Sequence, residues 1–580
     1  MINLKILMDG FFTVLASNLY RSTINPSNTF KKYSGKLFIS NVTFFFPIED
    51  YLNILYNHSN FYFMGESIFF SLVLCLLLFS LSWRLKCSNR VLNLTVTVYI
   101  LFLLVILFLS IYFTPTAYIG AKLLFNHSLL INYFTSNIRL FVIFFTAIFL
   151  VISLKYFFSE NNKENDFTEY SLLIAFSVFF LLILVSSFDL MVMYMAIEGL
   201  SIILYILAMF PFNESSIEAS IKYYTLGALS SGILLFGISL MFGICGSFDF
   251  INIKFFYFFC PNNYLVNYIM FLCLAFGFLF KIAAFPCHMW SPDVYEGTWL
   301  PTTIFFMTVV KMALYFFFVR FVIYFFYDIF YIYQDILMAS AIGSAIVGCF
   351  GSLYQQGIKR LLAYTSISQV GFSFLGLICA SLEGISASLL FFIVYIVVSV
   401  GIFAILINVE SYYKGGSLVY LSDLTNFSKY NISVALIFTI FLFSMAGIPP
   451  LGGFVSKLVI FASATGSYFY TFTIGLITIS TINVYVYVRM VKAMWSDILL
   501  ISNEKELLSY DIFIMSLPTN WEANKGESFL FSCYQKLISF ILLSIAFFVI
   551  SFLLFFPEYT LWCNELAISI INSVFIDFCI

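Results

Sequence analysis

Apolar stretches long enough to cross a bilayer recur along almost the whole chain of 580 residues. A membrane-spanning helix needs about 20 apolar residues. Fourteen segments fit this length, at approximately 62–83, 95–114, 137–158, 170–188, 190–210, 219–244, 265–287, 301–326, 333–354, 362–381, 386–408, 432–465, 468–494 and 536–556. Only 10% of the residues are charged, against about 25% in soluble domains. The chain is therefore predicted to be an all-α membrane protein with about 14 transmembrane helices.

The spans divide the chain into six parts. These are an N-terminal extension at 1–60, helices 1–3 at 61–169, helices 4–8 at 170–331, helices 9–13 at 332–496, a polar loop at 497–535, and helix 14 with a short tail from residue 557 at 536–580. The extension has no clean span, and it lacks the short apolar core and small-residue cleavage site of a signal peptide. If the chain belongs to an organelle with its own genome, we therefore expect it to be made inside that organelle.

Basic residues lie mainly in the loops on one side of the predicted membrane. Loops on that side contain Arg84, Lys86, Arg90, Lys155, Lys163, Lys359, Arg360, Lys414, Lys429, Arg489, Lys492, Lys505, Lys525 and Lys536. Loops on the other side contain Lys122, Lys254 and Arg320. The positive-inside rule then predicts that the N-terminus lies on the outer side, facing the intermembrane space or periplasm. The extension carries four further basic residues there, and the rule does not explain them.

Two of the predicted spans are interrupted. The seventh reads FLFKIAAFPCHMW, and the twelfth reads SMAGIPPLGGFVSK. Proline removes a backbone donor and clashes with the preceding turn, and such a break persists in a membrane only where protein or water satisfies the freed groups. Because the two breaks lie five spans apart, the pattern predicts two inverted five-helix repeats, helices 4–8 and 9–13. In transporters built this way, broken helices line the ion path.

Among the charged residues inside the predicted spans, five are singled out because they lie in otherwise apolar sequence: Glu198, Lys222, Lys281, Lys311 and Lys457. Each costs about 2.5–3.5 kcal/mol at the centre of a bilayer even on the mildest scale. Charges at this cost indicate an ion or proton path.

We interpret Glu198, Lys281, Lys311 and Lys457 as a proton relay at the membrane midplane. Glu198 and Lys281 are expected to form an ion pair; when the pair separates, the buried lysine loses its counter-ion and tends to release its proton. Two ammonium groups about 10 Å apart repel by roughly 1.7 kcal/mol at an effective dielectric constant of 20. That repulsion is enough to bias proton transfer from one lysine to the next.

Other polar residues near these spans have two readings each. Lys222 lies close to the start of its span, so it either extends to the interface or modulates the relay near Glu198. His288 is either an accessory proton ligand or a hydrogen-bonded structural histidine. Asp293 and Glu296, in a predicted loop, are expected to brace helices 7 and 8, and Asp189 and Glu383 are expected at helix ends.

Several functional classes find no support in the sequence. The eleven cysteines include no C-x-x-C pair, so neither a metal nor an iron–sulfur site is expected. No glycine-rich nucleotide motif occurs, and we expect no cofactor to bind this chain. A net charge of −2 gives no reason to expect nucleic acid as a partner. The 77 phenylalanines are typical of an AT-rich organelle genome.

Four stretches resemble the antiporter-like subunit 2 of respiratory complex I, the NADH:ubiquinone oxidoreductase. They read IEASIKYYTLGALSSGILLFGISLMFG, FKIAAFPCHMWSPDVYEG, GIKRLLAYTSISQVGF and FSMAGIPPLGGFVSK. The resemblance covers about residues 62–495. The P-x-H-x-W-x-P-D segment is shared by the antiporter-like subunits, and PDVYEG in place of PDAH is typical of subunit 2.

The resemblance implies an all-α membrane protein with two inverted five-helix units and broken helices 7 and 12. By position, Glu198 corresponds to the family's glutamate of helix 5, and Lys222, Lys281, Lys311 and Lys457 to its lysines of helices 6, 7, 8 and 12. Two residues depart from the family pattern: Cys287 replaces a usual Phe, and Gln369 a frequent His.

The resemblance also implies an enzyme subunit that translocates protons and contains no redox centre. NADH, FMN, the iron–sulfur clusters and ubiquinone would then belong to other subunits. The implied partners are other membrane-arm subunits, among them antiporter-like subunit 4, and lipids. The implied location is the mitochondrial inner membrane, and the composition favours a mitochondrially encoded protist protein.

Three alternatives remain open on the sequence alone. A stand-alone cation/proton antiporter subunit shares the same ancestry, although PDVYEG argues against it. A plastid-type quinone oxidoreductase subunit carries the same motif. A silent scaffold would keep the fold without the function, but it would tend to lose charges that are so costly.

Overall fold

The computed structural model describes residues 72–73, 99–101, 103–105, 122–125, 127–159, 167–210, 212–259, 264–326, 330–410, 419–425, 427–496, 538–539, 541–552 and 554–575. The chain divides into two compact units, Met1–His58 and Ser59–Ile580, and every described residue belongs to the second unit. The predicted extension 1–60, the polar loop 497–535 and most of the first two predicted spans lie outside the described residues.

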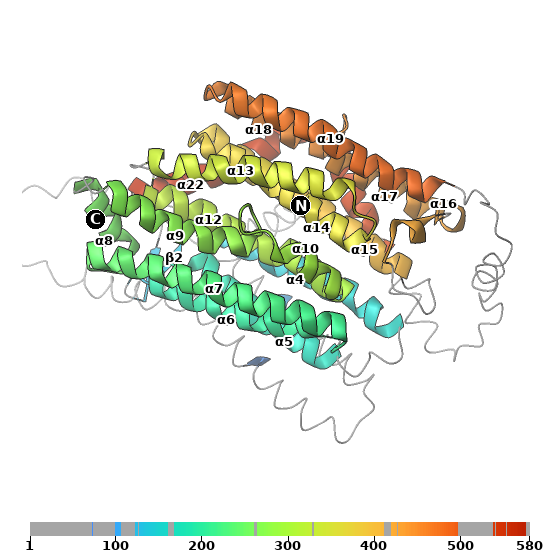
Figure 1. The fold of residues 1–580 in the computed structure, drawn as a ribbon, viewed down its shortest axis with the longest axis horizontal. Helices are drawn as coiled ribbons and strands as arrows, with labels where there is room; N and C mark the ends of the chain where they lie inside the picture. The colour runs from blue at the N-terminus through green and yellow to red at the C-terminus, as the bar shows by residue number, and fades with distance from the viewer. Residues whose placement is uncertain are drawn as a thin grey trace, which may run out of the picture. The chain divides into compact units, whose positions relative to one another are not determined.

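Each predicted span from the third to the thirteenth is helical (Figure 1). The helices are α4 (Tyr133–Ser159), α5 (Phe167–Ser186), α6 (Leu190–Met209), α7 (Glu214–Cys245), α9 (Tyr264–Ile282), α11 (Leu300–Phe305), α12 (Lys311–Phe326), α13 (Phe330–Leu353), α14 (Ile358–Ile378), α15 (Leu382–Glu410), α17 (Ile432–Ala446), α18 (Gly452–Gly466) and α19 (Tyr470–Trp495). Within the described part of the chain, nine helical segments are long and apolar enough to cross a membrane, or ten if one bent pair counts as a span. The predicted all-α membrane fold is therefore confirmed. The count of about 14 spans includes segments outside the described residues and stays a prediction.

Four short elements lie between these longer helices. They are α8 (Phe250–Phe259), α10 (Trp290–Gly297), α16 (Phe427–Tyr430) and the 3-10 turn η4 (Leu421–Leu424). Asp189 caps the start of α6, where its carboxylate accepts a hydrogen bond from the Met191 amide at 3.0 Å. Glu383 lies in the first turn of α15. Both residues are at helix ends, as their sequence positions predicted.

The seventh span is a broken helix made of α9 and α10. Residues 283–289 separate the two halves, and the indole Nε1 of Trp290 donates to the Phe280 carbonyl across the break at 2.9 Å. The prediction of a loop at SPDVYEG is wrong, because these residues form the second half of the span. Proline in the first turn of a helix lacks only a donor that would have no partner there, so Pro292 is compatible with α10.

The twelfth span is broken as predicted, between α17 and α18. Gly447 ends α17 in the left-handed conformation, with φ 85°. The two breaks lie in helices that cross in opposite directions, because four complete spans separate them. Lys281 precedes its break and Lys457 follows its own, so both lysines lie on the same membrane side of the breaks.

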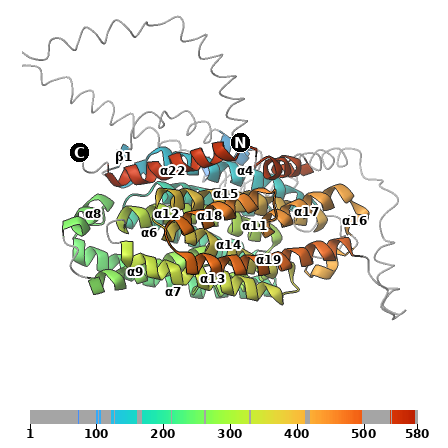
Figure 2. The same ribbon diagram turned by 90° about the horizontal axis from the view of Figure 1, so that it is seen from above.

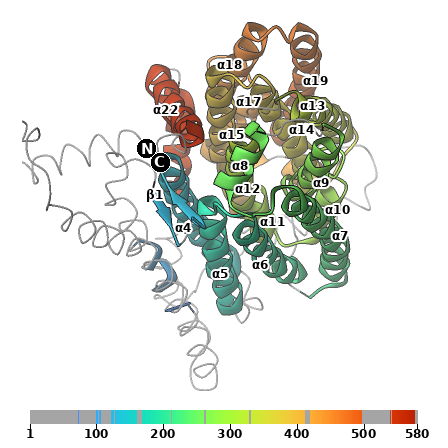
Figure 3. The same ribbon diagram turned by 90° about the vertical axis from the view of Figure 1, so that its left-hand side faces the viewer.

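The two repeats pack against each other through their central helices. The first repeat runs from α5 to α12 and the second from α13 to α19; α10 contacts α14, and α12 contacts α15. Figure 3, a view along the bundle, shows α12 and α15 inside the ring formed by the other helices. Every residue in the most apolar window of Leu300–Phe325 is buried, against 33% for α7 and for α19. The eighth span, which carries Lys311, is therefore at the centre of the protein.

Two elements were not predicted. Strands β1 (Lys122–Leu124) and β2 (Leu129–Ile131) form an antiparallel hairpin before α4. The expected tail from residue 557 is instead helix α22 (Phe556–Phe575), since Pro557 lies in the first turn, where proline is tolerated. Figure 2 shows α22 beside α4, and the Trp562 ring packs on Phe141 at 5.4 Å.

Candidate functional site

Glu198 and Lys281 approach each other without forming the expected ion pair. Lys281 ends α9 and is 6% exposed, and the charge of Glu198 on α6 acts on its ammonium group. Neither Lys281 Nζ nor Glu198 Oε1 has a hydrogen-bond partner among the described residues. The pair predicted from sequence is therefore a through-space interaction in this structure.

An aromatic ring lies against the Lys281 ammonium group. Lys281 Nζ lies 5.8 Å from the centre of the Tyr205 ring, within the range of a cation–π interaction. The Tyr205 ring meets Tyr223 edge to face at 4.8 Å. Its hydroxyl occupies the space where a side chain at Gly227 would be, so the glycine of α7 makes room for the tyrosine of α6.

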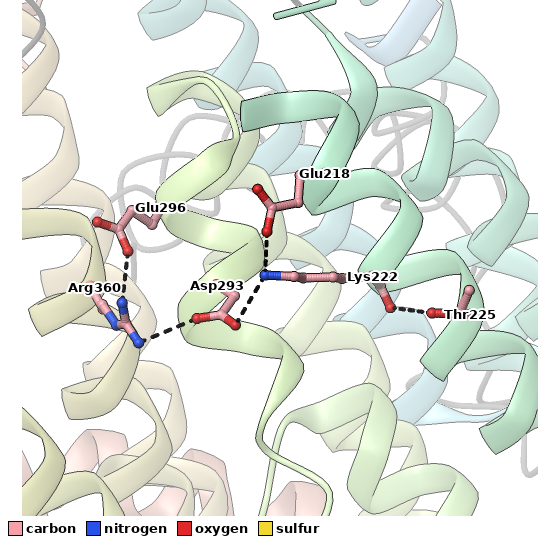
Figure 4. A network of polar contacts seen from close by, with 6 residues as sticks. All are labelled: Glu218, Lys222, Thr225, Asp293, Glu296 and Arg360. Carbon is pink, nitrogen blue, oxygen red and sulfur yellow. Dashed lines mark hydrogen bonds and ion pairs between the residues drawn. The ribbon is translucent and has the colours of Figure 1, made fainter. Parts of the chain in front are cut away.

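Lys222 pairs with carboxylates other than Glu198. Its Nζ lies 2.6 Å from Glu218 on α7 and 3.7 Å from Asp293 on α10, and its side chain is 44% exposed (Figure 4). This exposure fits the interfacial reading of Lys222. The contact with Asp293 was not predicted as an ion pair, although Asp293 was expected to brace the helices around it.

Lys311 lies between the two repeats and is 1% exposed. Its Nζ donates to Ser366 Oγ of α14 at 2.9 Å and lies 5.7 Å from the centre of the Tyr295 ring of α10. The five residues before it, Phe306–Val310, form the π-helical turn η3. Such turns insert one extra residue into a helix and often occur at functional sites. This turn ends at Val310, directly before Lys311 begins α12.

Lys457 closes the break in the twelfth span. Its Nζ donates to the carbonyl oxygens of Met445 and Ala446, each at 3.0 Å, and the residue is 6% exposed. The carbonyl end of a helix attracts positive charge. A side chain at Gly447 would lie 3.2 Å from this Nζ, so the glycine gives the lysine access to the helix end.

Polar side chains of α14 lead from Lys311 toward Lys457. Ser366, which accepts from Lys311, donates to the Ala363 carbonyl of its own helix at 2.6 Å. One turn further along α14, Gln369 Nε2 donates to the Tyr487 hydroxyl at 3.2 Å. One more turn along, the Phe372 ring lies 5.4 Å from Lys457 Nζ. Ser366, Gln369 and Tyr487 thus form a row of polar side chains, here called the polar seam. The seam was not predicted, and its only signal in the sequence is the run of hydroxyl and amide residues in TSISQ.

His288 lies in the break of the seventh span and is buried. Its ring stacks on Phe285 at 6.0 Å, and its carbonyl oxygen accepts from the Ser291 amide and hydroxyl, each at 3.0 Å. Its Nδ1 has no hydrogen-bond partner within the described part of the chain. The backbone of His288 thus has a structural role, and its ring has capacity for another partner.

Comparison with known proteins identifies the family. The family model described as NADH:quinone oxidoreductase/Mrp antiporter, transmembrane, matches residues 187–483. The chain is 35% identical over 398 residues to NADH-quinone oxidoreductase subunit N of Parvibaculum lavamentivorans, covering 68% of this chain and 80% of the relative. It is 36% identical over 386 residues to NADH-ubiquinone oxidoreductase chain 2 of Marchantia polymorpha, covering 65% and 76%.

Solved structures share the fold. A chain of respiratory complex I from Thermus thermophilus, solved with bound aureothin, matches with a TM-score of 0.63 at 21% identity, over 84% of this chain and 98% of that one. A chain of the Mrp complex from Dietzia sp. matches with a TM-score of 0.69 at 15% identity, over 88% and 98%. The resemblance found in the sequence is confirmed, and the chain belongs to the transmembrane family of NADH:quinone oxidoreductase and Mrp antiporter subunits, among relatives named subunit N and chain 2.

Proposed function

We propose that this chain is a proton-translocating subunit in the membrane arm of an NADH:quinone oxidoreductase. The observation that carries the proposal is the burial of Lys281, Lys311 and Lys457 in three spans, none of them in a direct ion pair within the described residues. An unpaired charge at this depth is costly, so each lysine is suited to exchange a proton. The names of the relatives support the assignment to this enzyme complex.

Protons would move along the row Glu198/Lys281, Lys311 and Lys457. A lysine can donate hydrogen bonds both as ammonium and as neutral amine, so Lys311 can keep Ser366 as a partner in either state. Hydroxyl groups both donate and accept, which suits Ser366 and Tyr487 to carry protons between the lysines. Repulsion between neighbouring charges would then favour release from one lysine when another gains a proton.

Redox chemistry would take place in other subunits. Within the described residues, no group of three or more His, Cys, Asp and Glu is placed to hold a metal ion. We assign NADH, FMN, iron–sulfur clusters and ubiquinone to neighbouring chains. The exposed apolar helix faces would contact other membrane-arm subunits, among them antiporter-like subunit 4, and lipids. We further propose a mitochondrial inner-membrane location, with the N-terminus facing the intermembrane space.

The test is Lys311→Met in the assembled complex in its own membrane. We expect NADH:quinone turnover and proton pumping to fall together by about 10-fold or more, because a positioned proton-transfer group contributes at least that much. Native gels would confirm assembly. The matched control is Lys492→Met, at an exposed position in the last turn of α19, which should leave both activities unchanged.

Two outcomes would contradict the proposal. Normal pumping at normal turnover in Lys311→Met would remove this lysine from the path. Proton movement that continues without NADH and quinone, driven by a cation gradient, would instead support the stand-alone cation/proton antiporter.

A further inference from the structure

The second half of the broken seventh span carries two carboxylates on one face. Asp293 and Glu296 of α10 both pair with Arg360 of α14, at 3.4 Å and 3.2 Å. Asp293 also pairs with Lys222 of α7 at 3.7 Å. Figure 4 shows Asp293 between the two basic side chains. The network formed by Lys222, Asp293, Glu296 and Arg360 thus joins the first repeat to the second through α10.

Further contacts hold α10 in the same place. Lys359 Nζ of α14 donates to the Thr298 carbonyl, at the end of α10, at 2.7 Å. A side chain at Gly297 would meet the Ser215 carbonyl and the Ala219 side chain, so α10 lies directly against α7. At its other end, Trp290 stacks on Tyr223 with ring centres 4.6 Å apart.

Tyr295, also on α10, has a side chain at the centre of the protein. It is 1% exposed, and its ring centre lies 5.7 Å from Lys311 Nζ. Its hydroxyl is buried and has no hydrogen-bond partner among the described residues. The same eight-residue helix therefore carries the inter-repeat ion pairs and an aromatic residue against the central lysine.

The ion pairs are poorly suited to a purely stabilising role. The side chains of Lys222, Asp293, Glu296 and Arg360 are between 36% and 46% exposed, and exposed ion pairs contribute little to stability. Their role is instead geometric. Asp293 pairs with a residue of α7 and a residue of α14, so its carboxylate fixes the position of α10 between these two helices. The two carboxylates, Asp293 and Glu296, belong to PDVYEG, the segment that stands in place of PDAH and is typical of subunit 2.

We propose that Asp293 and Glu296 are positioning residues that hold Tyr295 against Lys311 through their ion pairs with Lys222 and Arg360. The inference rests on the proposed proton relay, since its effect is exerted on Lys311. The ion network places α10 between α7 and α14, and α10 places the Tyr295 ring. Loss of either carboxylate would loosen α10 without removing any group from the row of lysines.

A double-mutant cycle tests this inference in the assembled complex. Asp293→Asn and Tyr295→Leu, which removes the aromatic ring, are each expected to lower NADH:quinone turnover by about 3- to 10-fold, and the double variant should be no slower than the slower single variant, because both act on one contact. Asp293→Glu should restore most of the turnover. The control is Glu214→Gln, an exposed carboxylate in the first turn of α7, whose effect should be negligible alone and additive with Tyr295→Leu.

Glu296→Gln provides a second route if Asp293→Asn prevents assembly on native gels. It leaves Asp293 in contact with both basic residues, so we expect a smaller loss of turnover that is again absent in the Tyr295→Leu background. Effects of Asp293→Asn or Glu296→Gln that simply multiply with that of Tyr295→Leu would overturn the positioning role, as would normal turnover in these variants. Lys311→Met, measured in the same set of variants, separates the two proposals. Normal proton pumping in Lys311→Met overturns both proposals. Loss of pumping in Lys311→Met, together with effects of the carboxylate and Tyr295 variants that multiply, overturns the positioning role alone.

Discussion

Lys311 and Ser366 belong to different repeats, and their side chains meet at 2.9 Å in the centre of the protein. The lysine begins the last helix of the first repeat, and the serine lies in the second helix of the second repeat. This hydrogen bond is where the buried lysine of the first repeat contacts the polar seam of the second.

Ser366→Ala should slow the enzyme while leaving assembly intact. The variant removes the side-chain acceptor of Lys311, and a net loss of about 1 kcal/mol for one hydrogen bond corresponds to roughly a 5-fold decrease in turnover. NADH:quinone turnover of the assembled complex measures the effect. Ser340→Ala on α13 is the control, because among the described residues the Ser340 hydroxyl bonds only to the Leu337 carbonyl of its own helix. Equal rates in the two variants would show that the Ser366 contact is not used.

Gly447→Ala should destabilise the break in the twelfth span. A non-glycine residue in the left-handed conformation costs about 1–2 kcal/mol, and the new Cβ would lie 3.1 Å from Lys457 Cδ. The midpoint of thermal inactivation of the purified complex should fall. Gly475→Ala on α19, where an added Cβ meets nothing within 4 Å, should leave the midpoint unchanged or raise it slightly. If Gly447→Ala has the same thermal midpoint as the wild type, the backbone at the break adjusts to the alanine without a loss of stability.

Gln369→Leu should interrupt the seam on α14. The change removes the amide that donates to the Tyr487 hydroxyl at 3.2 Å, so we expect turnover to fall by about 3- to 10-fold. Tyr487→Phe should give a similar loss, and the combination should be no worse than the stronger single change. If the two losses multiply instead, the residues act separately.

Gly227→Ala should lower stability through a collision with Tyr205. The added Cβ would overlap the Tyr205 hydroxyl and lie 2.8 Å from its Cζ. Tyr205→Phe removes the nearest atom, so the double variant should regain part of the lost thermal midpoint. Gly232→Ala, on the same helix with open space around it, is the comparison. The prediction fails if Tyr205→Phe and Gly227→Ala lower the midpoint independently.

The membrane fold could be predicted from the sequence because its strongest signals are local. The length of an apolar segment determines a span, and Pro and Gly mark a break, as at Pro286 and Pro450. Helix α22 was missed because its sequence mixes apolar and polar residues and contains no apolar run of about 20 residues. The loop predicted at Asp293 was wrong because α10 has only eight residues, among them Pro292 and Gly297, although proline is tolerated in a first turn.

The burial of Lys281, Lys311 and Lys457 could also be predicted, because each lies well inside an apolar segment, but their partners could not. Lys222, near the start of its segment, is instead 44% exposed. Lys222 pairs with Glu218 four residues earlier, a spacing visible in the sequence. In contrast, Lys311 bonds to Ser366 because α12 and α14 meet in the fold. Lys281 faces the Tyr205 ring, whose hydroxyl fits beside Gly227 of α7, and this contact too depends on how the helices pack.

The two hydrogen bonds from Lys457 to the end of α17 mean that this side chain fastens two half-helices together. A replacement that cannot donate to these carbonyl groups therefore also separates the half-helices. A defect in such a Lys457 variant would combine a lost proton carrier with a loosened helix break, whereas a Lys311 variant loses one hydrogen bond to a serine side chain of the other repeat and leaves the helix breaks intact.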